Sequence, residues 1–362
     1  MNENDHSYEV GNQTEFPLST LSLLSLALLI KPIIHTMIVT CSLLVSSQPI
    51  WLLVFSLLGF LIILQRSAAV VRWVYRAFLR SPKDLRRYGS WVIVTGATDG
   101  IGKSFAYQLA SAGLNLILIS RSSAKLKSVS EDIQSQFPDT NIKIIELDFT
   151  EDDIGAGIAE IKEMIEDLDV GILINNVGIT YPNANFFHEV DEKVWMDVLK
   201  VNVKGTTWVT KAVLPKMIKK NRGAIVNIGS GAAVIVPSHP LYAIYAATKA
   251  YVDQFSRSLH VEYKDRGIDV QCQVPLYVAT EMASRVASVS RASLFIPSAD
   301  DYVRAAIRRI GYEPRCTPYW SHSLQWCFAC LLPEAVLDAW RLSIGLQRRR
   351  KRSDEIGRHE RD

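Results

Sequence analysis

A glycine cluster between a short apolar run and a helical stretch limits the possible folds more than any other feature of the sequence. The apolar run Trp91–Thr95 leads directly into Thr95-Gly96-Ala97-Thr98-Asp99-Gly100-Ile101-Gly102, and the pattern over 103–112 predicts a helix. In such a strand–turn–helix unit, the three glycines permit a tight turn, close approach of a phosphate to the backbone, and close helix–strand packing. The cluster therefore predicts a dinucleotide site with the pyrophosphate at the start of the helix.

Short apolar runs recur along residues 89–280 and alternate with stretches of helical periodicity. Each run is rich in Ile, Val or Leu and is followed by polar residues or glycine. The runs predict six strands, at 91–95, 115–120, 142–147, 170–175, 224–228 and 268–274, with helices between them, for example over 103–112 and 194–218. Nearly continuous apolar strands alternating with helices indicate a parallel sheet covered on both faces. We therefore expect an α/β fold with a doubly wound parallel sheet of the Rossmann type.

The residues after the second predicted strand bear on the choice between NAD and NADP. NAD-binding domains usually place an acidic residue there for the ribose 2′-hydroxyl. This sequence has Ser120-Arg121-Ser122 instead, with Lys125 one turn later. A guanidinium group fits a 2′-phosphate by its charge and its bidentate geometry. NADPH is therefore the predicted cofactor; the alternative is that Arg121 is a surface arginine paired with an acid.

Tyr245 and Lys249 stand four positions apart in a helical stretch, so they share one face of the helix. A nearby ammonium favours the phenolate and would lower the tyrosine pKa from about 10 toward working pH. Ser230 follows the strand at 224–228, at the sheet edge where active-site residues gather, and its hydroxyl would hold a carbonyl oxygen beside Tyr245. The alternatives are a chance surface pair, Tyr242 in place of Tyr245, and a serine that only caps a turn.

These motifs together resemble the short-chain dehydrogenase/reductase family in residue type and in order. The resemblance rests on Thr95–Gly102, Asn175-Asn176-Val177-Gly178, Asn202, Ser230 and the Tyr245/Lys249 pair, and covers roughly residues 88–280. It implies that Tyr245 is the acid/base, that Ser230 orients the substrate carbonyl, and that Lys249 binds the nicotinamide ribose and lowers the Tyr245 pKa. It also implies that Asn202 holds a water in a proton relay. The expected cofactor-binding residues are Gly96, Thr98, Asp99, Gly100, Ile101, Gly102, Arg121, Lys125, Asp148, Asn176, Tyr245 and Lys249, and no metal is expected.

A narrower resemblance runs from about residue 37 to 346. The apolar N-terminal region and the segments 86–91, 274–280 and 311–315 are similar to those of the plant very-long-chain 3-oxoacyl-CoA reductases, which are related to microsomal 17β-hydroxysteroid dehydrogenases. The resemblance implies endoplasmic reticulum residence and NADPH-dependent reduction of 3-oxoacyl-CoA in fatty acid elongation. The expected partners are long-chain acyl-CoA, membrane lipid and other elongation enzymes, and a homo-oligomer is left open. The alternatives are a 17β-hydroxysteroid dehydrogenase and a weakly active nucleotide-binding scaffold of the elongation complex.

Two departures from the family pattern accompany this resemblance. Ser230 and Tyr245 are 15 positions apart, a longer gap than is usual in the family, so extra residues should bulge near 237–240. Pro275-Leu276 replaces the usual Pro-Gly.

The first hundred residues predict a membrane anchor. Apolar residues make up 48% of the chain and the mean hydropathy is +0.11, which is high for a soluble enzyme. The region 18–65 is almost continuously apolar, and 43–64 is long enough for one span, whereas a second span over 18–39 would contain Lys31-Pro32. A cleaved signal peptide does not fit, because the N-terminus is acidic and the apolar region is far too long.

The segment 66–88 is strongly basic and predicts the orientation of the anchor. Seven Lys and Arg residues stand there against Asp84, so this flank and the domain after it should lie in the cytosol. Arg72, Arg76 and Arg80 recur every four residues and would form one stripe on a helix at the membrane surface. A solvated linker helix is the alternative. Use of Asn12 as a glycosylation acceptor would depend on whether there are one or two spans.

The rest of the chain adds three expectations. The stretch 319–332 is apolar and aromatic but short for a span, so it predicts a lid over the substrate cleft, a membrane-associated helix or plain core. Arg348–Arg352 suggests a solvated basic tail. The expected organisation is a polar extension (1–17), an apolar anchor region (18–65), a basic juxtamembrane helix (66–88), an NADP-binding catalytic domain (89–280), a C-terminal region over the cleft (281–346) and a charged tail (347–362).

Charge and cysteine usage exclude some classes of protein. The net charge is +3, and the tail 347–362, with seven basic and four acidic residues, carries all of it. The remainder is neutral, so no global basic field favours nucleic acid. Five scattered cysteines are too few for a disulfide scaffold and indicate a reducing compartment. Cys327-x-x-Cys330 lacks a second ligand pair, so structural cysteines are expected there rather than zinc.

Overall fold

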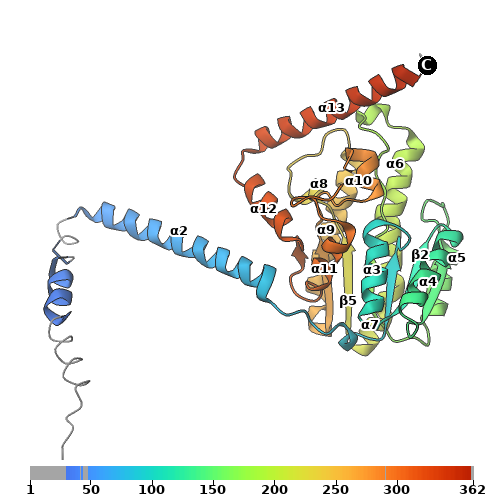
Figure 1. Ribbon diagram of the computed structural model, residues 1–362, viewed down its shortest axis with the longest axis horizontal. Helices are drawn as coiled ribbons and strands as arrows, with labels where there is room; N and C mark the ends of the chain where they lie inside the picture. The colour runs from blue at the N-terminus through green and yellow to red at the C-terminus, as the bar shows by residue number, and fades with distance from the viewer. Residues whose placement is uncertain (1–29, 41, 44–47, 290, 360–362) are drawn as a thin grey trace, which may run out of the picture. The chain divides into compact units, whose positions relative to one another are not determined.

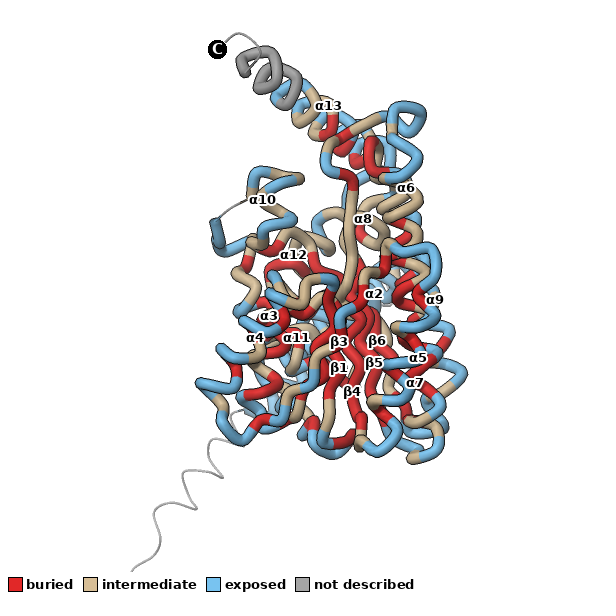
Figure 2. Tube along the Cα trace, turned by 90° about the vertical axis from the view of Figure 1, so that its right-hand side faces the viewer, coloured by how far each residue is buried: buried red, intermediate tan, exposed pale blue. Residues whose placement is uncertain are grey.

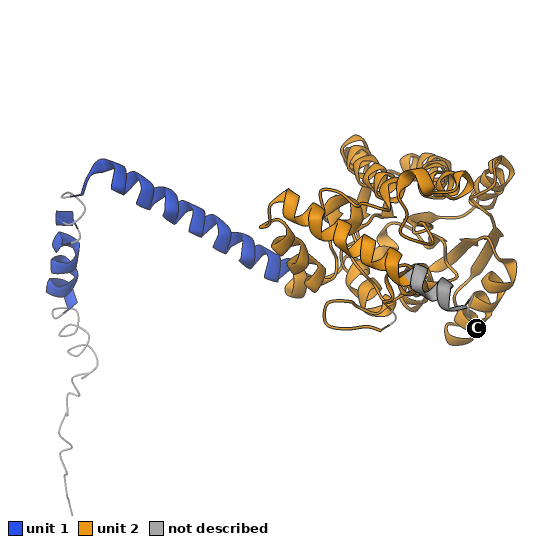
Figure 3. Ribbon diagram, turned by 90° about the horizontal axis from the view of Figure 1, so that it is seen from above, with its two compact units in different colours: residues 1–76 blue, residues 77–362 orange. Residues whose placement is uncertain are grey.

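The chain folds into two compact units, Met1–Arg76 and Ala77–Asp362 (Figure 3). The computed structural model describes residues 30–40, 42–43, 48–289 and 291–359, with the backbone alone for 352–359. The predicted polar extension and Asn12 lie outside the described residues, as does most of the predicted second span. Its last part, Ile30–Thr40, is a short apolar helix.

Among the described residues, one helix is long and apolar enough to cross a membrane. This helix runs over Ile50–Leu79, as α2 (Ile50–Val74) followed by the π-helical turn η1 (Tyr75–Leu79). None of the α2 residues is buried. The helix ends at Leu79, so the predicted juxtamembrane helix to residue 88 is too long, and Arg80 does not continue the stripe of Arg72 and Arg76.

Arg80 leaves the helix because it makes specific contacts in the second unit. Its guanidinium donates to both carboxylate oxygens of Glu313, at 2.7 and 2.8 Å, and stacks over the Tyr312 ring. Lys83 donates to the Gly311 carbonyl, and Tyr88 hydrogen-bonds Asp269. These contacts hold 80–88 against β6 and against the loop before the last strand.

A seven-stranded parallel sheet forms the centre of the second unit (Figures 1 and 2). The order is β3-β2-β1-β4-β5-β6-β7. The strands are β1 (Trp91–Thr95), β2 (Asn115–Ser120), β3 (Ile142–Glu146), β4 (Val170–Asn175), β5 (Gly223–Ile228), β6 (Ile268–Gln273) and β7 (Arg315–Cys316). The six predicted strands and the doubly wound parallel fold are confirmed. The two-residue β7 was too short to be seen as a pattern.

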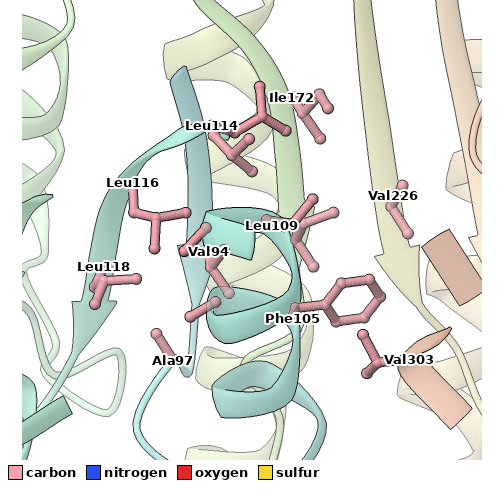
Figure 4. Packing of buried hydrophobic residues seen from close by; sticks show 14 of the residues in the cluster. Val94, Ala97, Phe105, Leu109, Leu114, Leu116, Leu118, Ile172, Val226 and Val303 are labelled. Carbon is pink, nitrogen blue, oxygen red and sulfur yellow. The ribbon is translucent and has the colours of Figure 1, made fainter. Parts of the chain in front are cut away.

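Helices cover both faces of the sheet because alternate strand residues face opposite sides. Val92 and Val94 pack in one core with α3 (Gly100–Ser111), α4 (Ser123–Gln136) and α11 (Ala299–Ile307), whereas Ile93 packs in a second core with α5 (Gly155–Met164), α7 (Thr206–Lys220) and α9 (Ala243–Tyr263). Figure 4 shows Phe105 and Leu109 of α3 against the first face.

The remaining helices surround the carboxyl ends of the strands, where the site lies. They are α6 (Glu192–Leu199), the π-helical η4 (Lys200–Gly205), α8 (Gly231–Val234), α10 (Glu281–Ala287), α12 (Trp320–Ala329), α13 (Glu334–His359) and the 3-10 turn η3 (Phe187–Glu189). Two further 3-10 turns, η2 (Leu85–Arg87) and η5 (Lys264–Arg266), lie before the amino ends of β1 and β6 instead. Leu337 and Gly345 of α13 pack on the unit, Gly345 against the Leu241 side chain. The predicted core character of 319–332 holds for Ser321 and His322, which are fully buried.

Candidate active site

The glycine turn adopts the conformation that its sequence predicts. Gly96 and Gly100 have φ values of +65° and +50°, a region that favours glycine. A Cβ at Gly102 would overlap the Gly96 carbonyl oxygen, so the third glycine permits close packing of α3 on the turn. The helix begins at Gly100 rather than 103, because the Asp99 carboxylate accepts the Gly100 N–H at 2.6 Å.

Asn176 holds this turn against the end of the neighbouring strand. Its side-chain amide donates to the carbonyl oxygens of Thr95 and Gly96, both at 3.1 Å. The Thr95 hydroxyl in turn accepts the N–H groups of Asn176 and Val177. The contact crosses from β4 to β1, where the strand order reverses, and in open α/β sheets ligands bind at this point.

One cavity of about 1130 Å³ lies over this edge of the sheet and contains most of the predicted site residues. Its lining includes Gly96, Thr98, Asp99, Gly100, Ile101, Arg121, Asp148, Asn176, Ser230, Tyr245 and Lys249. Gly102, Lys125 and Asn202 are not part of the lining. Gly102 and Asn202 are buried behind it, and Lys125 is exposed on α4.

Several of the residues that line the cavity also make hydrogen bonds that hold the surrounding loops. The Thr98 hydroxyl lies 2.9 Å from that of Ser120 and joins the glycine turn to the end of β2. Asp148 accepts from the N–H and hydroxyl of Thr150, both at 2.9 Å. Arg121 is exposed directly after β2, at the mouth of the region where a dinucleotide ribose would lie. These residues and the glycine turn fit a nicotinamide dinucleotide.

Ser230 and Tyr245 come together although 15 positions separate them. Ser230 follows β5 and caps α8, since its hydroxyl accepts the Ala232 N–H at 3.1 Å. The same side chain lies beside Tyr245, near the start of α9, and both residues line the cavity. Ser230 is therefore both the cap that its glycine-rich surroundings suggest and a partner of the tyrosine. The intervening residues form α8 and the loop that carries His239.

The Tyr245 pKa lies above its usual value in this structure, and Lys249 is not among the groups that shift it, so the predicted lowering by Lys249 stays a prediction. Burial raises the pKa of the Tyr245 phenol, and the hydrogen bond from Ser230 only partly opposes it. The Lys249 ammonium donates to the Ile228 carbonyl at 2.9 Å, so it is directed to the end of β5. Burial also lowers the pKa of Lys249 to about 8, because desolvation penalises its charged form.

Asn202 lies in η4, and its side chain makes three hydrogen bonds. Its amide donates to the Ile179 carbonyl and the Thr248 hydroxyl, and its oxygen accepts the Ile179 N–H, all at 2.9 Å. Thr248 adjoins Lys249 in α9, so Asn202 joins the loop after β4 to α9. π-helical turns of this kind are frequent at functional sites. The predicted role of Asn202 in holding a water stays a prediction.

The substrate side of the cavity contains residues that the sequence did not single out. His239, Tyr277, Arg341 and Arg348 all line it. Arg348 donates to the Tyr277 hydroxyl at 2.9 Å. The prediction of a solvated tail from residue 348 is therefore wrong at its first residue, because α13 is one helix from Glu334 and turns Arg348 inward. Its neighbour Arg349 pairs with Glu189.

His322 of α12 braces the loop that follows β6. Its Nδ1 accepts the Leu276 N–H at 3.3 Å, and its Nε2 lies 3.2 Å from the Tyr277 carbonyl oxygen. Burial lowers the pKa of His322 to about 4, so it is neutral at working pH with the proton on Nε2. His322 therefore holds the loop at Pro275-Leu276, where the sequence differs from the Pro-Gly of the family pattern.

Cys327 and Cys330, for which the sequence predicts no zinc site, are both free and exposed. Within the described ranges, no group of three or more His, Cys, Asp or Glu side chains could hold a metal ion.

The fold and the site together define the class of this protein. Residues 90–290 match the short chain dehydrogenase family, and the chain belongs to it. It is thus an oxidoreductase of a family whose fold holds a nicotinamide dinucleotide.

Three similar proteins illustrate this family relationship. The chain is 58% identical over 305 residues to the very-long-chain 3-oxoacyl-CoA reductase-like protein of Arabidopsis thaliana, a match that covers 84% of this chain and 97% of that protein. It is 41% identical over 270 residues to the inactive hydroxysteroid dehydrogenase-like protein 1 of Homo sapiens, covering 74% of this chain and 79% of that one. A solved short-chain dehydrogenase from Sphingobium yanoikuyae in complex with NADPH has 30% identity and a TM-score of 0.54, over 60% of this chain and 83% of the other.

Proposed function

We propose that this protein reduces 3-oxoacyl-CoA to 3-hydroxyacyl-CoA with NADPH, as a step of very-long-chain fatty acid elongation. The observation that carries the proposal is that one and the same cavity joins the glycine turn, the Ser230–Tyr245 pair and an apolar extension. The likeness to the Arabidopsis thaliana reductase-like protein supports the choice of substrate.

The chain's own groups suit protonation of a carbonyl oxygen. Because burial keeps the Tyr245 pKa above its usual value, the phenol is protonated at neutral pH and can give its proton to a developing alkoxide. The Ser230 hydroxyl, which lines the cavity beside Tyr245, would hold the same oxygen, so charge is stabilised where it forms. A bound nicotinamide would supply the hydride. Lys249 would bind the nicotinamide ribose, and Asn202 would fix the loop and helix around it.

NADPH is proposed over NADH because of the charge at the end of β2. Arg121 lines the cavity directly after that strand, where NAD-binding domains usually carry an acid. Lys125 follows on α4 and adds a second positive charge outside the lining. A 2′-phosphate would accept charge-assisted hydrogen bonds from the guanidinium. The Sphingobium yanoikuyae structure shows that a related chain binds NADPH.

The apolar end of the cavity suits a long acyl chain. Phe328, Leu332, Val336, Trp340 and Met282 line this end and are also exposed, Phe328 by 67% and Trp340 by 53%. Such a rim is where an apolar chain would enter. The segment 319–332 is therefore proposed to combine lid and membrane-contact roles, with α2 as the anchor in the endoplasmic reticulum membrane and the catalytic unit in the cytosol.

Two other functions are tested by the same experiment. A 17β-hydroxysteroid dehydrogenase would reduce steroid ketones, and a scaffold, as the name of the Homo sapiens relative suggests, would reduce neither substrate. We would assay the purified full chain in detergent with NADPH, using 3-oxohexadecanoyl-CoA and a 17-oxosteroid. Turnover of the thioester alone supports the proposal. Turnover of the steroid alone, or of neither compound, contradicts it.

A further inference from the structure

Two arginines occupy the inner face of α13, where apolar residues are expected. Arg341 and Arg348 are seven positions apart, so they lie two turns apart on one side of the helix. The neighbouring inner positions, Leu337 and Gly345, are buried against the catalytic unit. A helix face that packs on a core is normally apolar, and arginine is rarely buried unless it is paired.

Arg341 is the more deeply buried of the two, with an exposed fraction of 8%. Its Nη2 lies 2.9 and 2.8 Å from the two ring nitrogens of His239. Its Nε atom is buried and has no hydrogen-bond partner. A buried donor of this kind is costly to leave unsatisfied, so it favours an acceptor from a ligand.

In the part of the chain that the structure describes, this arginine pair has no acidic partner. Among the described residues, no carboxylate forms an ion pair within 4.0 Å with either guanidinium. Asp338, one turn before Arg341, hydrogen-bonds Ser238. Burial, together with the charges of Arg341 and Arg348, lowers the pKa of His239 to about 3, so the imidazole is neutral and adds no charge. The substrate side of the cavity therefore holds two positive charges and selects for an anion.

We propose that Arg341 and Arg348 bind a phosphate group of coenzyme A, the carrier of the thioester substrate. Both arginines line the same cavity as Ser230 and Tyr245, so a ligand held by them can share that cavity with the reacting carbonyl. Guanidinium groups bind phosphate through paired, charge-assisted hydrogen bonds. The inference rests on the proposed function and deepens it, since a neutral steroid has no group for this site. The headgroup of an anionic phospholipid offers the same chemistry, and the experiment separates the two sources.

The test measures binding, so it does not depend on turnover. The full chain in a neutral detergent, with NADPH present, is titrated by calorimetry with coenzyme A, with pantetheine, which lacks the phosphates, and with glycerophosphoserine, a phospholipid headgroup. The variants are Arg341→Gln and Arg348→Gln. The matched control is Arg350→Gln, which removes the same charge from an exposed position of the same helix. Arg341→Lys keeps the charge in case Arg341→Gln does not fold.

We expect each inner variant to weaken coenzyme A binding by about tenfold or more, the effect of one charge-assisted hydrogen bond. Pantetheine binding should stay the same, Arg350→Gln should bind like the wild type, and Arg341→Lys should lose less than Arg341→Gln. Equal losses in Arg350→Gln, equal losses for pantetheine, or unchanged coenzyme A binding would each overturn the site. Arginine-dependent binding of glycerophosphoserine without binding of coenzyme A would assign it to lipid and overturn it as well.

The outcome also separates this site from the proposed reaction. A wild-type chain that binds coenzyme A through these arginines but does not reduce 3-oxohexadecanoyl-CoA would retain the site and refute the reaction. A chain that reduces the thioester while both variants bind coenzyme A normally would retain the reaction and refute the site.

Discussion

The buried lysine of the active site should make the folded protein less stable at neutral pH, and replacing it should reveal this cost. Lys249 has an exposed fraction of 6%, and burial lowers its pKa from the usual 10.5 to about 8. Between these two values the unfolded chain binds a proton that the folded chain does not. The wild type must therefore gain stability as the pH rises through this range. Lys249→Met has no such group and should lack this gain.

The magnitude follows from the two pKa values. They place the destabilisation by Lys249 at about 3 kcal/mol at pH 7 and about 1 kcal/mol at pH 9.5. Lys249→Met removes this destabilisation at each pH. It also leaves the Ile228 carbonyl without its hydrogen-bond donor, which costs about 1–3 kcal/mol of stability independently of pH. The cost of this lost hydrogen bond therefore decides whether Lys249→Met is more or less stable than the wild type at a given pH. The difference in stability between the variant and the wild type should nevertheless shift by about 2 kcal/mol between pH 7 and pH 9.5.

Urea titrations of the detergent-solubilised full chain at the two pH values measure this shift. Lys219→Met, at an exposed position of α7, controls for the introduced thioether side chain. The free energy of unfolding of Lys249→Met, relative to that of the wild type, should be lower at pH 9.5 than at pH 7. A stability difference between Lys249→Met and the wild type that is the same at both pH values would refute the reasoning from burial.

Three further outcomes test the site and the anchor. Tyr245→Phe removes only the proton donor, so turnover should fall by about 10²-fold or more while NADPH binding, measured by fluorescence, persists; near-normal turnover would show that another group is the acid. Arg121→Ala should raise the KM for NADPH more than that for NADH by a factor equivalent to about 1–3 kcal/mol, and equal changes would exclude a 2′-phosphate contact. Protease added to sealed microsomes should digest the domain after Arg66 without detergent, because the basic residues from Arg66 to Arg87 resist translocation; protection until detergent is added would reverse the proposed orientation.

The sequence predicted the parts of this structure that depend on local patterns. The glycine turn could be predicted because positive φ values and a close helix contact both require glycine at Gly96, Gly100 and Gly102. The six longer strands could be predicted because both faces of a parallel sheet are buried, which leaves nearly continuous apolar runs. Tyr245 and Lys249 could be found because helical spacing alone places them on one side of α9.

The parts that could not be predicted depend on tertiary contacts between distant residues. Arg80 ends the apolar helix through Glu313, which is far along the chain, so helical periodicity alone extended that helix too far. The direction of the Lys249 ammonium depends on the Ile228 carbonyl rather than on the spacing to Tyr245. Arg348 begins a basic run that resembles a solvated tail, and only the packing of α13 shows that it faces Tyr277.

The energetics of the cavity favour a catalytic protein over a scaffold. A buried lysine with a lowered pKa and two inward arginines without a carboxylate partner among the described residues all oppose folding. A scaffold that only binds its neighbours has no need of such groups in one cavity, since apolar residues of similar size would be more stable there. Groups that reduce stability are typical of sites that bind charged ligands or do chemistry. The proposed reduction of a charged substrate would therefore explain Lys249 beside Tyr245 together with Arg341 and Arg348 across the same cavity.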